Sequence, residues 1–62
     1  MRIMANEIDM WNDIEELEKV DRKMANEMLK IYYAKFIENN DKLANQLREK
    51  FEKKYGIELK YW

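Results

Sequence analysis

Apolar residues recur at helical spacing through most of this 62-residue chain. From Met10 to Tyr32 they keep one helical phase, at positions 10, 11, 14, 17, 20, 24, 28, 31 and 32. A second stripe follows at Leu43, Leu47 and Phe51, which lie four residues apart on one helical face. Because the chain has no proline and one glycine, little interrupts these patterns. The spacing therefore predicts an all-α protein.

Polar residues suggest where the helices begin and end. The clearest break lies at residues 39–41, because Asn and Asp accept turn conformations, and we expect Asp41 to cap the helix that follows. Gly56 suits the end of that helix, after two lysines that favour its negative pole. Asp21 falls inside the upstream apolar stripe, where a carboxylate is costly unless it meets water or caps a new helix.

Two architectures follow from Asp21, both with residues 1–62 as a single helical mini-domain. If Asp21 is an N-cap, the protein is a small bundle with an aromatic C-terminal tail and three short helices, at about 7–19, 21–38 and 41–55. This is the version that we favour. If the helix runs through Asp21, the protein is a long-helix hairpin that dimerises as a four-helix bundle, with helices at 7–38 and 41–55.

So short a chain buries only about 60% of its unfolded surface, and it has no cysteine to add a disulfide. Residues 24–37 are apolar around most of the helix, so they need cover from two directions, from their own neighbours or from a second copy. We expect Trp11 to lie in the core, with an exposed anchor for a partner as its alternative. We expect Ile57 and Leu59 to point inward and Trp62 to close the bundle, with an exposed aromatic anchor for a partner as the alternative for this tail.

Charge is distributed unevenly although the net charge is only −1. Residues 1–20 carry six acids and two bases, residues 21–41 are balanced, and residues 42–62 carry six bases and three acids. The two ends should attract each other, within one chain or between two chains. Because single surface ion pairs contribute little free energy, charge would select the pairing rather than hold it together.

The side chains that most enzymes use are absent. The sequence has no serine, threonine, histidine or cysteine, so it lacks the usual nucleophiles, the imidazole base and the common zinc ligands. We therefore expect no enzyme activity and no cofactor. No apolar run is long enough for a secretory signal or a bilayer-spanning helix, which favours a cytoplasmic protein with no membrane association.

One carboxylate pattern raises a remote alternative. Glu15-x-x-Glu18 and Glu38-x-x-Asp41 resemble the paired-acid signature of the all-α nucleotide pyrophosphatases. The resemblance implies four acids that hold Mg²⁺ against a nucleoside triphosphate, and oxygen ligands suit that ion. However, the second pair runs into the break at residues 39–41, and the chain is shorter than a usual protomer of that family.

Nucleic acid is the second candidate partner. The basic C-terminal third offers Lys50, Lys53, Lys54 and Lys60 beside aromatic residues, which could contact phosphates and stack on bases. Three glutamates among these lysines reduce the local positive potential.

The composition favours a non-catalytic protein-binding module, a small regulator or inhibitor that docks on itself, as a homodimer, or on a larger protein. The candidate docking residues are apolar or aromatic: Met24, Met28, Ile31, Tyr32, Phe36, Tyr61 and Trp62. Many Lys, Asn, Ile and Tyr with few Arg are typical of AT-rich genomes, consistent with a phage or mobile-element origin.

Overall fold

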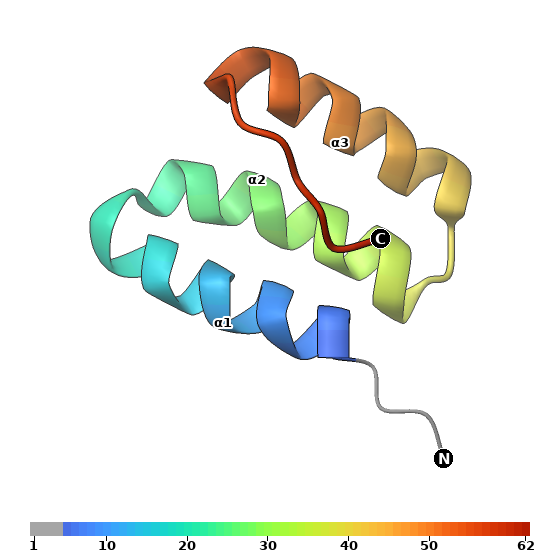
Figure 1. Cartoon of the computed structure of the whole chain (residues 1–62), viewed down its shortest axis with the longest axis horizontal. Coiled ribbons are helices and arrows are strands. Elements are labelled where there is room, and N and C mark those ends of the chain that lie inside the picture. The colour runs from blue at the N-terminus through green and yellow to red at the C-terminus, as the bar shows by residue number, and fades with distance from the viewer. Residues whose placement is uncertain (1–4) are drawn as a thin grey trace.

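The computed structural model describes residues 5–62 and contains three α-helices and one π-helical turn (Figure 1). Residues 1–4, the start of the predicted single domain, lie outside the described residues. The predicted small all-α bundle of three helices is confirmed. The elements follow one another along the chain as α1 (Ala5–Val20), α2 (Arg22–Tyr32), η1 (Tyr33–Ile37) and α3 (Asp41–Tyr55).

Asp21 separates α1 from α2, so the long-helix hairpin is wrong for this chain. Asp21 has an extended backbone, with φ −147° and ψ 91°, and its carboxylate accepts a 3.1 Å hydrogen bond from the Met24 N–H. This contact satisfies one of the amide groups that a new helix leaves without a partner in its first turn. An aspartate inside an apolar stripe is therefore accommodated as an N-cap facing water.

A π-helical turn ends the second helix, where the sequence predicts an uninterrupted helix over 21–38. The N–H of Glu38 donates to the Tyr33 carbonyl at 2.8 Å, five residues back. A π turn holds more residues than an α turn, so it changes the direction of the side chains that follow. Phe36 lies within this turn, with its ring 5.5 Å from that of Tyr32 and 6.2 Å from that of Trp62.

The connection to α3 has a different cap from the one predicted. Asn40, not Asp41, is the N-cap, and its side-chain oxygen accepts a hydrogen bond from the Leu43 N–H at 3.2 Å. Asn39 precedes it at φ 55°, a left-handed conformation that Asn tolerates. Asp41 instead begins the helix and pairs with Lys35 at 3.0 Å. The C-terminal cap is as predicted, because Gly56 adopts φ 68° after the last helical turn.

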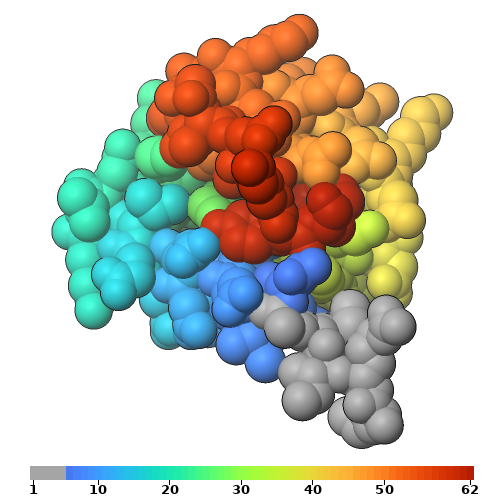
Figure 2. All heavy atoms as spheres, viewed as in Figure 1, coloured from blue at the N-terminus to red at the C-terminus, as the bar shows by residue number. Residues whose placement is uncertain are grey.

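Helix α2 lies between α1 and α3, and α1 and α3 run in the same direction (Figure 1). The tail, residues 57–62, returns across this layer, and the space-filling view shows it on the surface between α1 and α3 (Figure 2). The molecule measures 34 × 24 × 18 Å, so it has two broad faces, one of which carries the tail. No helix in residues 5–62 combines the length and the apolar character needed to cross a bilayer.

The core joins all three helices and the tail, and its residues are Met10, Ile14, Met28, Ile31, Tyr32, Phe51 and Leu59. Small residues, Ala25, Ala34 and Ala44, are buried as well, which lets neighbouring helices approach closely. Helices α1 and α3 thus cover the apolar middle segment from two directions, as expected, within one chain. The core prediction for Trp11 is wrong: the residue is 39% exposed, and its ring centre lies 5.4 Å from that of Tyr32.

Candidate functional site

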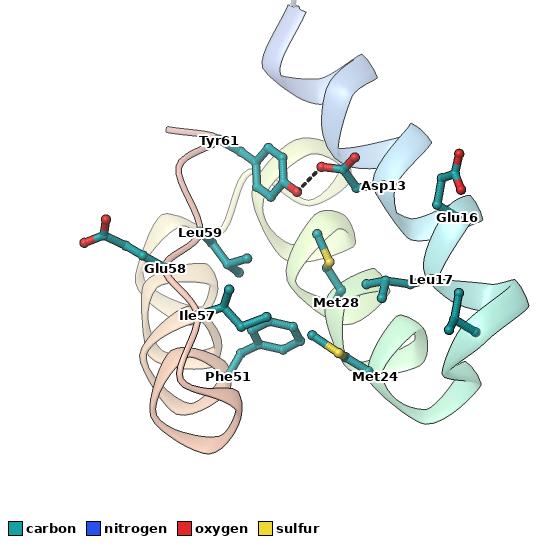
Figure 3. A pocket seen from close by; sticks show the side chains of 11 residues that line it. Asp13, Glu16, Leu17, Met24, Met28, Phe51, Ile57, Glu58, Leu59 and Tyr61 are labelled. Carbon is teal, nitrogen blue, oxygen red and sulfur yellow. Dashed lines mark hydrogen bonds between the residues drawn. The ribbon is translucent and has the colours of Figure 1, made fainter.

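An open apolar hollow of about 350 Å³ lies beside the tail, and we call it the groove (Figure 3). Side chains from α1, α2, α3 and the tail form it: Asp13, Glu16, Leu17, Val20, Met24, Met28, Phe51, Ile57, Glu58, Leu59 and Tyr61. Its size matches one large apolar side chain or a short stretch of a bound segment.

The walls of the groove are exposed apolar side chains above a buried floor. Val20 is 83% exposed because the last turn of α1 ends there, one residue before the Asp21 cap. Ile57 is 43% exposed on the opposite wall, formed by the tail. Met24 and Met28 lie between the two walls (Figure 3), and unbranched thioether side chains adapt readily to differently shaped ligands.

The charged side chains that line the groove are all acidic, and one of them, Glu58, also pairs with Lys60 at 3.4 Å. Asp13 and Glu16 project from α1 and Glu58 from the tail, and among residues 5–62 the lining includes no basic residue. Figure 3 shows the carboxylates at the margins of the apolar surface. An apolar hollow with such a rim attracts ligands that combine an apolar group with positive charge.

Asp13 also holds the tail in place by accepting a hydrogen bond from the Tyr61 hydroxyl (Figure 3). Partial burial of the phenol, together with this hydrogen bond and the nearby charge of Asp9, raises the pKa of Tyr61 above its ordinary value. The tyrosine therefore stays a neutral donor to Asp13 at physiological pH. One wall of the groove is thus fixed to α1.

Helix α3 anchors the rest of the tail. The Leu59 N–H donates to Glu52 Oε2 at 2.8 Å, and the Trp62 indole N–H donates to Asn45 Oδ1 at 3.0 Å. The guanidinium of Arg48 lies 4.9 Å from the centre of the Trp62 ring, a cation–π contact. Leu59 points inward and is 8% exposed, as predicted, whereas the inward prediction for Ile57 is wrong. The turn after Gly56 leaves Ile57 on the groove wall.

The predicted docking residues divide between core and groove. Met28, Ile31 and Tyr32 are buried in the core of a single chain, so they present no open docking face. Phe36 of η1 and Trp62 at the end of the tail pack against each other and are partly buried. The remaining two docking candidates, Met24 and Tyr61, line the groove, and the buried Met28 forms part of its floor.

Five apolar residues of the groove were not among the docking residues predicted from the sequence: Leu17, Val20, Phe51, Ile57 and Leu59. Val20 offered a usable signal, because an apolar residue directly before an N-cap lies at a helix end with few neighbours to cover it. The exposure of Ile57 has no comparable signal in the sequence.

The structure does not gather the four lysines proposed for nucleic acid. Lys50 and Lys53 line a polar hollow on α3 that also includes Glu49. Lys54 contacts the Glu27 carboxylate at 3.0 Å, and Lys60 pairs with Glu58 at 3.4 Å. Two of the four charges therefore already face acids within the chain.

The paired acids of the pyrophosphatase-like pattern lie apart as well. Glu15 and Glu18 belong to α1, whereas Glu38 follows η1 and Asp41 is paired with Lys35 at the start of α3. Within residues 5–62, no three acidic, histidine or cysteine side chains are placed to hold a metal ion.

No protein-family model, curated protein or solved structure matches this chain.

Proposed function

We propose that this protein is a non-catalytic protein-binding module, a small regulator or inhibitor, that acts through the groove. The partner segment places an apolar side chain between Val20, Met24 and Ile57. Basic residues of the same segment meet the acidic rim. The single observation that carries the proposal is the groove itself: exposed apolar walls with carboxylates at their margins, and no basic residue in the lining within the described part of the chain.

The groove and its surroundings support binding more than catalysis. Its polar side chains are three carboxylates and one phenol, and that phenol already donates to Asp13. Neither a nucleophile nor a base of the usual kinds is available in the sequence. What the groove offers is apolar area that water contacts unfavourably and a negative field that orients a cationic segment.

The absence of cysteine supports a place in a reducing compartment such as the cytoplasm. The Lys- and Asn-rich, Arg-poor composition supports a source with an AT-rich genome, such as a phage. Both extend the proposal, and neither is needed for the groove to bind a partner.

A pair of synthetic helical peptides tests the proposal. One contains leucine and lysine, and the other has the same leucines with every lysine replaced by glutamate. We expect the leucine–lysine peptide to bind, measured by isothermal titration calorimetry, and the leucine–glutamate peptide not to bind. Equal binding of both, or of neither, would show the groove proposal to be wrong.

Three variants locate the binding. Val20→Lys introduces a positive charge at an exposed groove wall, and we expect it to weaken binding by about tenfold or more. Glu16→Lys should act in the same direction by reversing a rim charge. Glu15→Lys is the matched control, because it makes the same charge change on the same helix outside the groove, and it should leave peptide binding nearly unchanged.

A further inference from the structure

A second apolar surface is formed by all three helices and centres on Tyr33. One hollow lies between Tyr33 and the α1 residues Ile8 and Trp11, and a second lies between Tyr33 and the α3 residues Leu43 and Leu47. Tyr33 is 45% exposed, and Ile37 beside it is 55% exposed. We call this surface the Tyr33 face.

The Tyr33 face lies on the opposite side of the helical layer from the tail. Residues two apart on an α-helix point about 200° apart, so they project to nearly opposite sides. On α1, Trp11 is two residues from Asp13, which binds the tail. On α3, Leu43 and Leu47 are each two residues from Asn45, which also binds the tail.

The two edges of the Tyr33 face, formed by α1 and α3, carry charged side chains of opposite sign. On α1, Glu15 and Glu18 follow Trp11 by four and seven residues, on the same side of the helix. On α3, Lys50 and Lys54 follow Leu47 by three and seven residues. The Tyr33 face therefore has an acidic edge on α1 and a basic edge on α3. Its centre is mainly apolar, and the two hollows there also include Glu7, Lys30 and Glu38.

The two edges do not neutralise each other within one chain. The ion pairs among residues 5–62 are Lys35–Asp41, Lys54–Glu27 and Lys60–Glu58, and none joins α1 to α3. Helix α2 separates them, so the attraction expected between the acidic and basic thirds of the sequence is not satisfied by packing α1 on α3.

We propose that a second copy of this chain covers the Tyr33 face, related by a two-fold axis parallel to α2. Such an axis places α1 of one subunit against α3 of the other, at both edges. A two-fold axis perpendicular to the helices would instead oppose α1 to α1 and bring acids together. The charge pattern selects the first arrangement.

The spacing of residues on the two edges agrees with this axis. Helices α1 and α3 run in the same direction, so the rotation sets them side by side without reversing either. Positions 8, 11, 15 and 18 of one subunit then meet positions 43, 47, 50 and 54 of the other at nearly equal intervals. Apolar residues then meet apolar residues, and Glu15 meets Lys50 of the partner subunit. Glu18 approaches Lys54 of the partner subunit, a lysine that also contacts Glu27 of its own chain.

The side of the molecule that carries the Tyr33 face measures 34 by 24 Å. An interface of standard size buries about 800 Å² of accessible surface on each partner, so a stable dimer would use most of this side. This dimer uses the side of the layer opposite to the groove, so both surfaces can be occupied together.

Sedimentation equilibrium of the full chain over a wide concentration range tests the dimer. We expect the mass to rise from the 7.7 kDa of one chain to twice that value. Glu15→Lys alone and Lys50→Glu alone should each weaken self-association by about tenfold, because each reverses two symmetric contacts. A mixture of the two variants should form a heterodimer of near wild-type affinity, since each reversed edge then meets the other.

Glu16→Lys is the control for association, because it makes the same charge change on the groove side of α1. Circular dichroism establishes that each variant is folded. A wild-type mass of one chain at every concentration would overturn the proposal. So would tighter association of the Glu15→Lys variant alone, which indicates α1 against α1, or a loss of association in Glu16→Lys with none in Glu15→Lys.

Discussion

The phenol of Tyr55 donates a 2.6 Å hydrogen bond to Glu27 Oε2 and thereby ties the last turn of α3 to α2. Lys54 donates to both oxygens of the same carboxylate, at 3.0 and 3.2 Å. The hydrogen bond from Tyr55, followed by that from Lys54, holds the pKa of Glu27 below its ordinary value. This cluster joins the two helices at the end remote from their connection at residues 38–40.

The lowered pKa of Glu27 makes the stability of the fold depend on pH. The contribution of this carboxylate is present above its unfolded pKa and is lost as the pH falls through the lower, folded value. We expect Glu27→Gln to lower the melting temperature at neutral pH and to make the loss of stability in acid shallower. Thermal melts followed by circular dichroism from neutral to acid pH measure both effects. Glu49→Gln, an exposed site on α3, is the control, and an equal effect there would contradict the prediction.

Alkaline pH should loosen the tail through Tyr61. Because its pKa is raised in the fold, the contribution of the neutral phenol is present below the ordinary value, about 10, and is lost as the pH rises through the folded value. We expect denaturant unfolding at high pH to show a larger loss of stability for the wild type than for Tyr61→Phe. Tyr33→Phe removes an exposed phenol outside the tail and is the control, with all proteins compared at a concentration low enough to keep the chain a monomer. If both variants behave alike, the Asp13 contact does not matter in solution.

Neighbouring tail residues should differ sharply in their effect on stability. Leu59→Ala removes a side chain from the core, and we expect it to cost about 2–4 kcal/mol of the free energy of unfolding. Ile57→Ala removes a groove wall that is already exposed, so it should cost less than about 1 kcal/mol. Urea unfolding measures both. Similar values would mean that the tail is not packed as described.

The two N-caps give a test of the corrected helix start. Asp21→Ala and Asn40→Ala each remove the oxygen that accepts an N–H bond in the first turn, and we expect each to cost about 1 kcal/mol. Asp41→Ala removes only an exposed ion pair with Lys35, so it should cost less. Urea unfolding of the three variants ranks them. A larger effect at position 41 than at position 40 would contradict the assigned cap.

Local chemistry was enough to predict the fold class and most helix ends. Asp21 and Gly56 each act within a few residues of their own position, as a cap oxygen and as a left-handed C-cap. Asn40 and Asp41 are both good cap residues, so only the geometry of the loop decides between them. The π turn at η1 could not be predicted from the sequence. Its hydrogen bond between residues five apart accompanies the packing of Phe36 against Trp62 of the tail, a contact between distant parts of the chain.

The site was harder to predict than the fold. Helical phase shows that Met28, Ile31 and Tyr32 share an apolar side, yet it does not show whether a neighbouring helix covers that side. Here α1, α3 and the tail cover it. The apolar groove residues that stay exposed therefore lie at the end of a helix and at the start of the tail. Val20 and Ile57 are exposed because α1 ends at one and the tail begins at the other.

The anchored tail has a practical consequence for the design of probes. A fluorophore or affinity tag attached after Trp62 would lie beside the indole that Arg48 and Asn45 hold. It would compete with these contacts and so displace the tail, which carries Ile57 and Leu59. Weakened peptide binding in such a fusion would then result from a displaced tail and would not be a property of the native protein. Tags placed ahead of α1 avoid this artefact.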